Sequence, residues 1–210
     1  MKSILITVII LLSTLTISAQ KTRNIGFGVS PFGSAFADLS YDKSAKNSSR
    51  KNQLFTNIDY DSYINAHIFY EKQYEGITTL FEVKYATAKI NKYEQGSNTN
   101  LLPEDYNSNI SIYSGNVYIG YTINKQKRIQ LPLYIGGGLS YLNAEPISQA
   151  AFELSAKARL KFYISNKIAL YGGINYDLGL LGGNDDKNDK DKLTGYYGMY
   201  NLETGLMFSF

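Results

Sequence analysis

Apolar and polar side chains alternate with a period of two residues in eight segments between Asn24 and the C-terminus, and no comparable stretch shows a helical period. The clearest segment runs from Phe152 to Ile164, where apolar residues hold every second position and charged or polar residues lie between them. Successive side chains of a β-strand point to opposite faces, so the pattern predicts strands with one apolar and one polar face. The chain is therefore predicted to be all-β.

The connections between these segments alternate in length along the chain. An even number of strands of about ten residues, with short turns on one rim and longer loops on the other, is typical of a transmembrane β-barrel. We therefore predict an eight-stranded antiparallel up-and-down transmembrane β-barrel with both termini on the rim of short turns. The short connections are expected near 73–76, 124–128 and 165–167, and the longer ones at 33–61, 91–109, 143–150 and 182–194.

Alternation alone does not say which face points outward, so a soluble barrel or sandwich with an apolar interior is the alternative fold. A water-exposed outer face would be rich in Lys and Glu. Instead, the second face of four of the predicted strands carries mainly Gly, Ser, Ala, Asn and Tyr. Small side chains fit the narrow interior of an eight-stranded barrel, so the apolar face is predicted to contact lipid.

The first residues of the chain have the features of a cleaved export signal. Lys2 precedes an apolar run from Ile4 to Ile17, and a short exit of Ser18, Ala19 and Gln20 follows. The run is shorter than the roughly 20 residues that a membrane-spanning helix needs, which argues against an uncleaved anchor. We expect cleavage after Ala19, or after Gln20, and no lipoprotein anchor because the sequence has no cysteine. The predicted division is a signal peptide at 1–19 and a barrel at 20–210.

The last eight residues resemble the C-terminal assembly signal of outer-membrane barrels, with a polar residue, a glycine and two alternating aromatic residues that end the chain. The matching positions are Glu203, Gly205, Phe208 and Phe210. Together with the strand count, the chain from about Asn24 to Phe210 resembles the small OmpX-like and OmpA-like barrel families. The resemblance implies export to the bacterial outer membrane, contact with its lipid and lipopolysaccharide, and recognition by the barrel-assembly machinery. Those families share an architecture and no single activity.

Charge and motif content exclude several classes of partner. The formal net charge is +3, and basic and acidic residues are interspersed rather than gathered into a patch that would follow a nucleic acid backbone. The acidic segment Asn184–Lys192 lacks the central glycine and the distal glutamate of a calcium-binding loop, so it is interpreted as a solvated loop. We therefore expect no nucleic acid partner, no metal and no cofactor.

His67 is the only histidine, and its position in the alternation points it inward. Barrels that hydrolyse or transfer lipid acyl chains use a histidine beside a serine, and such chemistry needs the base within hydrogen-bonding reach of its nucleophile. The sequence supplies no such partner, so His67 is interpreted as part of a polar interior and no enzymatic activity is predicted. A lipid-modifying enzyme and a narrow channel remain as alternatives.

Charged residues also take inward positions, and four of them are acidic and four basic. Isolated charges in a narrow interior are costly, so we predict that they pair into a network that plugs the lumen. Arg159 is expected at its centre because a guanidinium can bridge two carboxylates in fixed geometry. The predicted network comprises Glu82, Lys84, Glu153, Lys157, Arg159, Lys161, Asp177 and Glu203.

The first long connection, at 33–61, keeps the alternation of the strands that flank it. Ala35, Ala37 and Leu39 continue the outward positions of the first strand, and Leu54 and Tyr60 continue those of the second. A hairpin that projects beyond the bilayer would present strand edges to other chains. We therefore predict a structural or surface-interaction role, with 33–61 as a candidate contact for a surface partner.

The terminal octet generates a test of assembly. Deleting Phe210, or replacing Phe208 and Phe210 by Ser, should slow insertion and expose the chain to periplasmic proteases, because the assembly signal is lost. The folded fraction in outer-membrane extracts, read from gel mobility before and after boiling, measures the effect. An unchanged folded yield would show that these aromatic residues are ordinary lipid-facing side chains.

Overall fold

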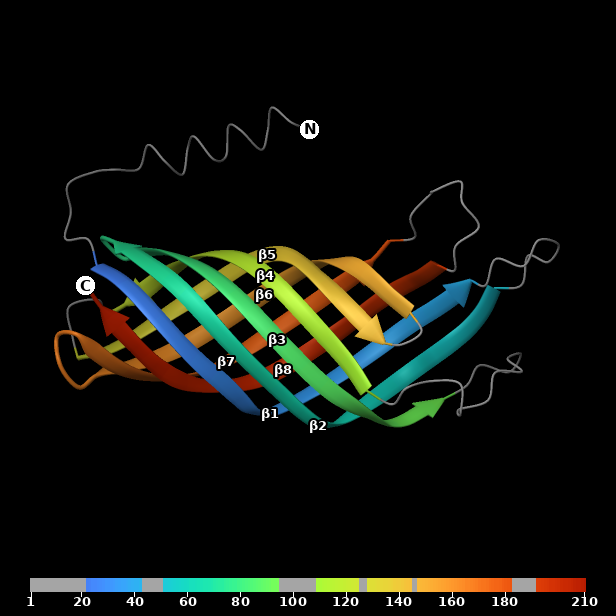
Figure 1. Cartoon of the computed structure of the whole chain (residues 1–210). Coiled ribbons are helices and arrows are strands. Elements are labelled where there is room, and N and C mark those ends of the chain that lie inside the picture. Colours follow the sequence, from blue (N-terminus) through green and yellow to red (C-terminus); the bar gives the residue numbers. More distant parts are fainter. Residues whose placement is uncertain (1–21, 43–50, 95–108, 125–127, 145–146, 183–191) are drawn as a thin grey trace, which may run out of the picture.

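The computed structural model shows a closed barrel of eight strands in chain order, all antiparallel to their neighbours (Figure 1). It describes residues 22–42, 51–94, 109–124, 128–144, 147–182 and 192–210, so the predicted signal peptide at 1–19 lies outside the described residues. None of the described segments forms a helix long and apolar enough to cross a membrane. The predicted fold class is confirmed. The strands are β1 (Thr22–Asp42), β2 (Lys51–Tyr74), β3 (Ile77–Glu94), β4 (Asn109–Ile123), β5 (Ile129–Ala144), β6 (Ile147–Tyr163), β7 (Ile168–Leu181) and β8 (Lys192–Ser209).

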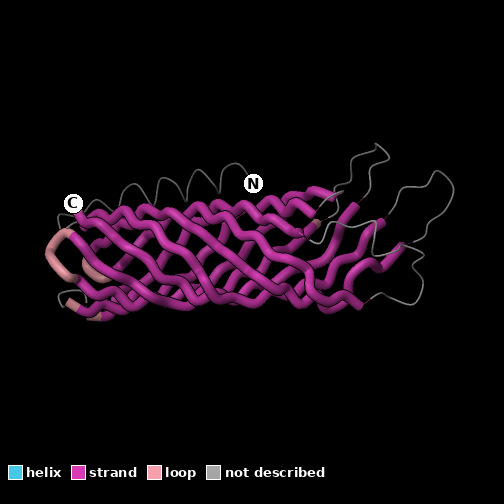
Figure 2. The backbone as a smooth tube through the Cα atoms, turned by 60° about the horizontal axis from the view of Figure 1, so that its bottom comes forward, coloured by secondary structure: helices cyan, strands magenta, loops and turns pink. Residues whose placement is uncertain are grey.

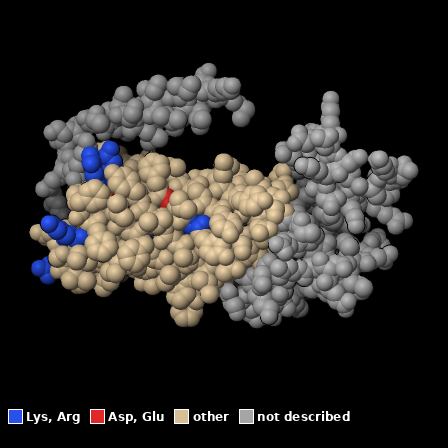
Figure 3. All heavy atoms as spheres, viewed as in Figure 1, with Lys and Arg blue, Asp and Glu red and all other residues tan. Residues whose placement is uncertain are grey.

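The apolar positions of the strands form the outer face of the barrel. Val83 on β3 and Ile135 on β5 are 62% and 68% exposed, whereas Glu82 and Arg159, at inward positions, are 2% and 0% exposed. On the face of the molecule seen in Figure 3, the described residues are mainly uncharged, with only scattered charged groups. A surface this apolar is stable against lipid acyl chains rather than water. The lipid-facing assignment made from the sequence therefore agrees with the structure.

Tyrosine side chains gather on the outer face where the apolar band ends. The rings of Tyr85 and Tyr113 lie 5.0 Å apart between centroids, and those of Tyr176 and Tyr200 lie 4.7 Å apart. At the opposite end, Tyr121 pairs with Ile77 beside the turn between β2 and β3. Aromatic rings with a polar tip favour the boundary between acyl chains and water. These tyrosines therefore mark two interfaces of the bilayer.

Short turns occupy the rim at which β1 begins and the chain ends, as Figures 1 and 2 show. The tightest of them joins β2 to β3 through Glu75 and Gly76, both with positive φ, and Gly76 accepts a hydrogen bond from the amide of Thr122. In barrels of this type the short-turn rim faces the periplasm. The opposite rim is then extracellular.

All four predicted long connections are shorter in the structure, and two of them differ most. β5 ends at Ala144 and β6 begins at Ile147, so the loop expected at 143–150 is wrong and most of it is paired strand. Within 33–61, β1 continues to Asp42 and β2 begins at Lys51, so this connection is largely the projecting strand pair that its alternation indicated. Polar side chains at a strand end that reaches water resemble loop composition, although the backbone stays in the sheet.

A β-bulge in β1 reverses the alternation that the sequence suggested for its second half. Two residues of β1 lie between Val29 and Phe32, whereas only one residue lies between their partners on β8, Thr204 and Leu202. Pro31 lies in this bulge, which is one of the few sheet positions that tolerate a residue without an amide hydrogen. As a result Phe32 is 69% exposed and Ala35, expected to face outward, is only 4% exposed. Its predicted orientation was wrong.

The outward apolar face predicts a specific sensitivity to charge. Ile68 on β2 is exposed on the outer face and lies between Phe27 and Val83 of the neighbouring strands. Ile68→Arg should lower the free energy of unfolding in lipid vesicles by about 2–4 kcal/mol, the scale for a basic residue near the bilayer midplane. Urea titration of tyrosine fluorescence measures it, with Ile68→Leu as the matched control. Equal stability of the two variants would contradict a lipid-facing position.

Candidate functional site in the barrel lumen

The centre of the lumen holds four charged side chains from three strands, which we call the central cluster. Arg159 on β6 donates from Nη2 to Glu82 Oε2 on β3 at 2.6 Å, and from Nε to Glu203 on β8. Lys157 Nζ lies 2.6 Å from Glu82 Oε1 and 3.0 Å from Glu203 Oε2. Two carboxylates and two cations therefore form a closed ring of ion pairs across the barrel.

Aromatic rings surround the guanidinium of Arg159. Its Cζ lies 4.2 Å from the ring centroid of Phe69 and 4.8 Å from that of Tyr171. Cation–π contacts of this kind add to the ion pairs where water is excluded. The Tyr171 hydroxyl is also hydrogen-bonded to His67 Nε2 at 2.6 Å. The ring of His67 is therefore held in place beside the central cluster.

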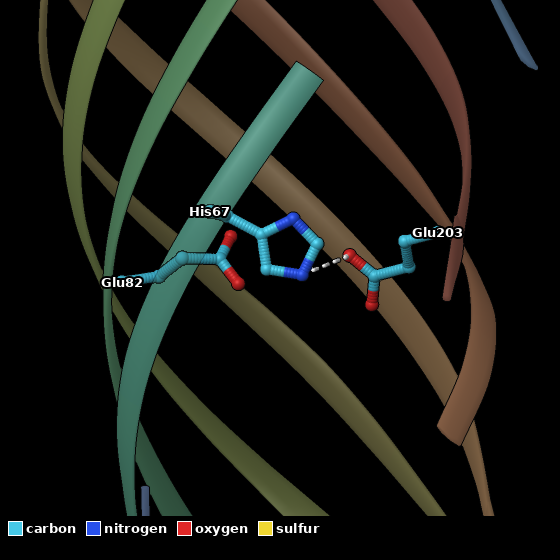
Figure 4. A group of neighbouring side chains, drawn as sticks. All are labelled: His67, Glu82 and Glu203. Atoms are coloured by element: carbon cyan, nitrogen blue, oxygen red, sulfur yellow. Dashed lines mark ion pairs between the residues drawn. The ribbon is translucent and has the colours of Figure 1, made fainter. Parts of the chain in front are cut away.

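His67, Glu82 and Glu203 point toward one another, as Figure 4 shows, with His67 Nε2 lying 3.8 Å from Glu203 Oε2. One ligand atom of each lies within 4.8 Å of the others, which is a spacing that a metal ion could use. Both carboxylates, however, already face Lys157 and Arg159. A divalent cation here would meet two fixed positive charges, so the geometry favours the ion-pair network over a metal site.

A second group lies on the extracellular side and joins Lys84, Glu153 and Asp177, which we call the upper cluster. Lys84 Nζ lies 2.8 Å from Glu153 Oε1 and 2.6 Å from Asp177 Oδ1. Neighbouring side chains donate the remaining hydrogen bonds to these two carboxylates. The donors to Glu153 are Ser114, Asn116 and Tyr197, and those to Asp177 are Ser155, Asn175 and Asn201.

A third group on the periplasmic side pairs Lys161 with Glu71, a residue that sequence reasoning missed. Lys161 Nζ lies 2.5 Å from Glu71 Oε1, and Glu71 also accepts from Asn24 Nδ2 at 2.7 Å and from the Tyr134 hydroxyl at 2.5 Å. Glu71 has the same inward alternation as His67 and Phe69. The alternation of the second strand was followed only from Ile64 to Tyr70, and one further residue toward the turn would have included Glu71.

All eight charged residues expected in the lumen are buried inside the barrel, and the structure distributes them over these three groups. Arg159 lies in the central cluster with Glu82, Lys157 and Glu203, whereas Lys84, Glu153 and Asp177 form the upper cluster and Lys161 pairs below. Beneath the central cluster an apolar and aromatic layer fills the lumen toward the periplasm. It comprises Phe69, Leu80, Tyr118, Tyr134, Ala169, Tyr171 and Met207.

The residues of the terminal octet divide between the two faces of β8. Phe208 and Phe210 are exposed on the outer face, and Glu203 points inward to Arg159. Gly205 pairs with Gly28 on β1, and the Tyr171 hydroxyl lies only 2.5 Å from where a Cβ on Gly205 would be. Gly205 therefore has a packing role in the lumen, and the interpretation of the octet as an assembly signal stays a prediction.

The closed antiparallel barrel, its apolar exterior and its charged, side-chain-filled interior define a small β-barrel protein of the outer-membrane type. The chain belongs to the family described as "Domain of unknown function (DUF2715)", whose model matches residues 21–210. No significant relative was found among curated proteins.

Solved structures share the fold at low sequence identity. A major outer membrane protein from Thermus thermophilus has a TM-score of 0.51 at 9% identity, covering 90% of this chain and 99% of that one. The outer membrane protein OprG from Pseudomonas aeruginosa has a TM-score of 0.50 at 12% identity, covering 91% and 96%. The Neisserial surface protein A, NspA, has a TM-score of 0.45 at 13% identity, covering 88% and 97%. The first two support the barrel architecture.

The central cluster predicts a large cost for removing Arg159. Arg159→Ala leaves Glu82 and Glu203 facing only Lys157, so the free energy of unfolding should fall by about 3–5 kcal/mol, the scale for breaking a buried pair. Urea unfolding of the refolded protein in lipid vesicles measures it. Arg128→Ala is the matched control because Arg128 is exposed beside β5. A variant at position 159 as stable as wild type would refute the network's structural role.

Proposed function

We propose that this chain is a non-enzymatic outer-membrane protein with a plugged lumen, which acts structurally or by contacting surface partners through its extracellular end. The observation that carries the proposal is the central cluster. Arg159 of β6 is fully buried and binds Glu82 of β3 and Glu203 of β8. Side chains from three strands that are not neighbours in the wall therefore meet inside the barrel.

Three layers support a closed lumen. The upper cluster, the central cluster and the aromatic layer each fill the inside at a different height, and none of their charged members is more than 4% exposed. An ion crossing the lumen would have to break buried ion pairs whose partners would then be left unpaired in a low dielectric. A narrow channel, the alternative function, requires a continuous aqueous path through these layers.

The extracellular ends of the strands support a role in surface contact. In the backbone register, Asp42 of β1 lies opposite Lys51 of β2 and Lys192 of β8, and Thr56 of β2 lies opposite Glu94 of β3. In contrast, β5 and β6 meet at Ala144 and Ile147. One side of the barrel thus continues as paired strands beyond the other, and β1 and β2 reach furthest in Figure 1. Paired strands present a more ordered surface than free loops do, and their edges suit strand addition.

The contacts of His67 favour a positioning role over catalysis. Its Nε2 bonds the Tyr171 hydroxyl, and its ring stacks on Phe69 at 6.3 Å between centroids. Nucleophilic acyl chemistry would instead need a serine or similar group within reach of the imidazole, at a place open to the lipid substrate. Outer-membrane lipid and lipopolysaccharide are accordingly proposed as neighbours of the apolar exterior and not as substrates.

Conductance measurement tests the plugged lumen. Purified wild-type protein, shown to be folded by its different gel mobility before and after boiling, should give no large, steady current in a planar lipid bilayer. The physical reason is that the ion pairs occupy the axis. A general porin measured in the same bilayers is the positive control. Reproducible large current steps from wild type would overturn the proposal of a closed lumen.

Surface contact through the projecting strands can be tested by site-specific cross-linking, since the sequence has no cysteine. Lys51→Cys on β2 should react with a membrane-impermeant maleimide on intact cells, whereas Lys167→Cys in the opposite turn should react only after permeabilisation. A photo-cross-linker at Lys51→Cys should then give discrete adducts. Ser148→Cys, exposed near the short β5–β6 connection, is the matched control. Equal adducts at positions 51 and 148, or none, would refute a specific role of the projection.

A further inference from the structure

The three charged groups in the lumen differ in net charge. The central cluster pairs two carboxylates with two cations, and Glu71 pairs with Lys161. The upper cluster instead sets two carboxylates, Glu153 and Asp177, against the single ammonium of Lys84. Among the residues whose side chains the structure describes, the buried lumen thus holds five carboxylates and four cations. His67 is counted in its neutral form, in which its Nε2 can accept from the Tyr171 hydroxyl.

The hydrogen-bonding pattern around the two carboxylates suits their ionised form. The groups that contact the carboxylate oxygens of Glu153 and Asp177 are an ammonium, amide NH₂ groups and hydroxyls, all of which can donate. The ammonium and the amide NH₂ groups can only donate, whereas the hydroxyls could also accept from a protonated carboxyl. With both carboxylates ionised, Lys84 is their single compensating cation, and a cluster neutralised by a proton would show no dependence on the cation.

Unpartnered oxygens lie beside the same two carboxylates. The Oδ1 atoms of Asn116, Asn175 and Asn201 have no hydrogen-bond partner among the described residues, although these side chains are only 2%, 4% and 3% exposed. Their Nδ2 atoms donate to the upper cluster, at 2.5 Å to Glu153 from Asn116 and at 2.6 Å to Asp177 from Asn175. Each amide thus borders the cluster while its oxygen is left without a donor.

The strand register brings the amides of Asn175 and Asn201 to one region of the lumen. Asn175 and Asn201 are directly opposite each other on β7 and β8, and both amides contact Asp177 Oδ2. Ser30, at the bulge on neighbouring β1, is 1% exposed and its Oγ is also unpartnered. Buried acceptors without donors are costly. A cation coordinated by these oxygen atoms would give them a partner and would also neutralise the excess negative charge.

We propose that the upper cluster binds one small monovalent cation, such as Na⁺ or K⁺, with Asp177 and the amide oxygens of Asn175 and Asn201 as its ligands. Carbonyl and carboxylate oxygens replace the hydration shell of such ions in proteins. A single positive charge brings the cluster to neutrality, whereas a divalent ion would leave an excess positive charge beside Lys84. The site requires no through-path, so its failure would leave the proposed plugged lumen intact.

Thermal unfolding of the refolded full chain tests the site at constant ionic strength. Wild type should unfold at a higher temperature in NaCl or KCl than in N-methylglucamine chloride, whose cation is too large to enter. Metal analysis of the desalted protein should find about one Na⁺ or K⁺ per chain, a stoichiometry that follows from the single unbalanced charge. Asn201→Ala keeps every charge and should reduce the cation-dependent shift. Asp177→Asn removes the excess charge and should abolish it.

Glu75→Gln is the control, because Glu75 is an exposed acid in the periplasmic turn. It should keep the wild-type shift. Two results would overturn the proposal: a wild type indifferent to the choice of cation, which would mean that a proton or water takes the place of the ion, or stabilisation by Ca²⁺ but not by Na⁺ or K⁺. If Asp177→Asn does not fold, Asn201→Ala still decides the test, because it removes a proposed ligand and keeps every ion pair.

Discussion

The structure depends on the pairing of charges that the barrel removes from water. A guanidinium in a narrow lumen is tolerated only when carboxylates surround it, and Arg159 has one from β3 and one from β8. Those contacts fix the relative height of three strands, because a shift of register by two residues would carry Glu82 or Glu203 away from it. Pairing thus specifies the barrel's register from within, while the apolar exterior only requires that each strand keep its alternation.

Much of this arrangement was predictable because a strand's alternation assigns every residue to a face. The inward set that includes Glu82, Lys157 and Arg159 follows from the apolar positions that flank these residues, and no knowledge of tertiary contacts is needed. The partners were harder to predict. Which residues meet across the lumen depends on how far each strand is shifted along its neighbour. Following the paired residues around the wall from Gly26 on β1, through Glu82 and Glu153, leads back to β1 at Ala37 rather than at Gly26. Sequence spacing does not reveal this stagger.

The errors have local causes. Ala35 was assigned to the wrong face because one extra residue beside Pro31 reverses the alternation, and a bulge leaves little trace in a period-two pattern. Glu71 was missed because the end of β2 was placed too early. The segment 143–150 was taken for a loop because strand ends above the membrane carry polar residues that resemble loop composition. In each case the hydrophobic pattern becomes uninformative where lipid no longer imposes it.

The two glycines that face each other across β1 and β8 have a consequence for the order of folding. Gly28 and Gly205 leave room for the Tyr171 hydroxyl, and Glu203, two residues before Gly205, supplies one of the two carboxylates of Arg159. Until β8 joins the sheet, the interior therefore lacks both the glycine that leaves room for the Tyr171 hydroxyl and one of the carboxylates that neutralise Arg159. Sealing the wall and neutralising the interior become one cooperative step, so a barrel that has not closed is also electrostatically incomplete.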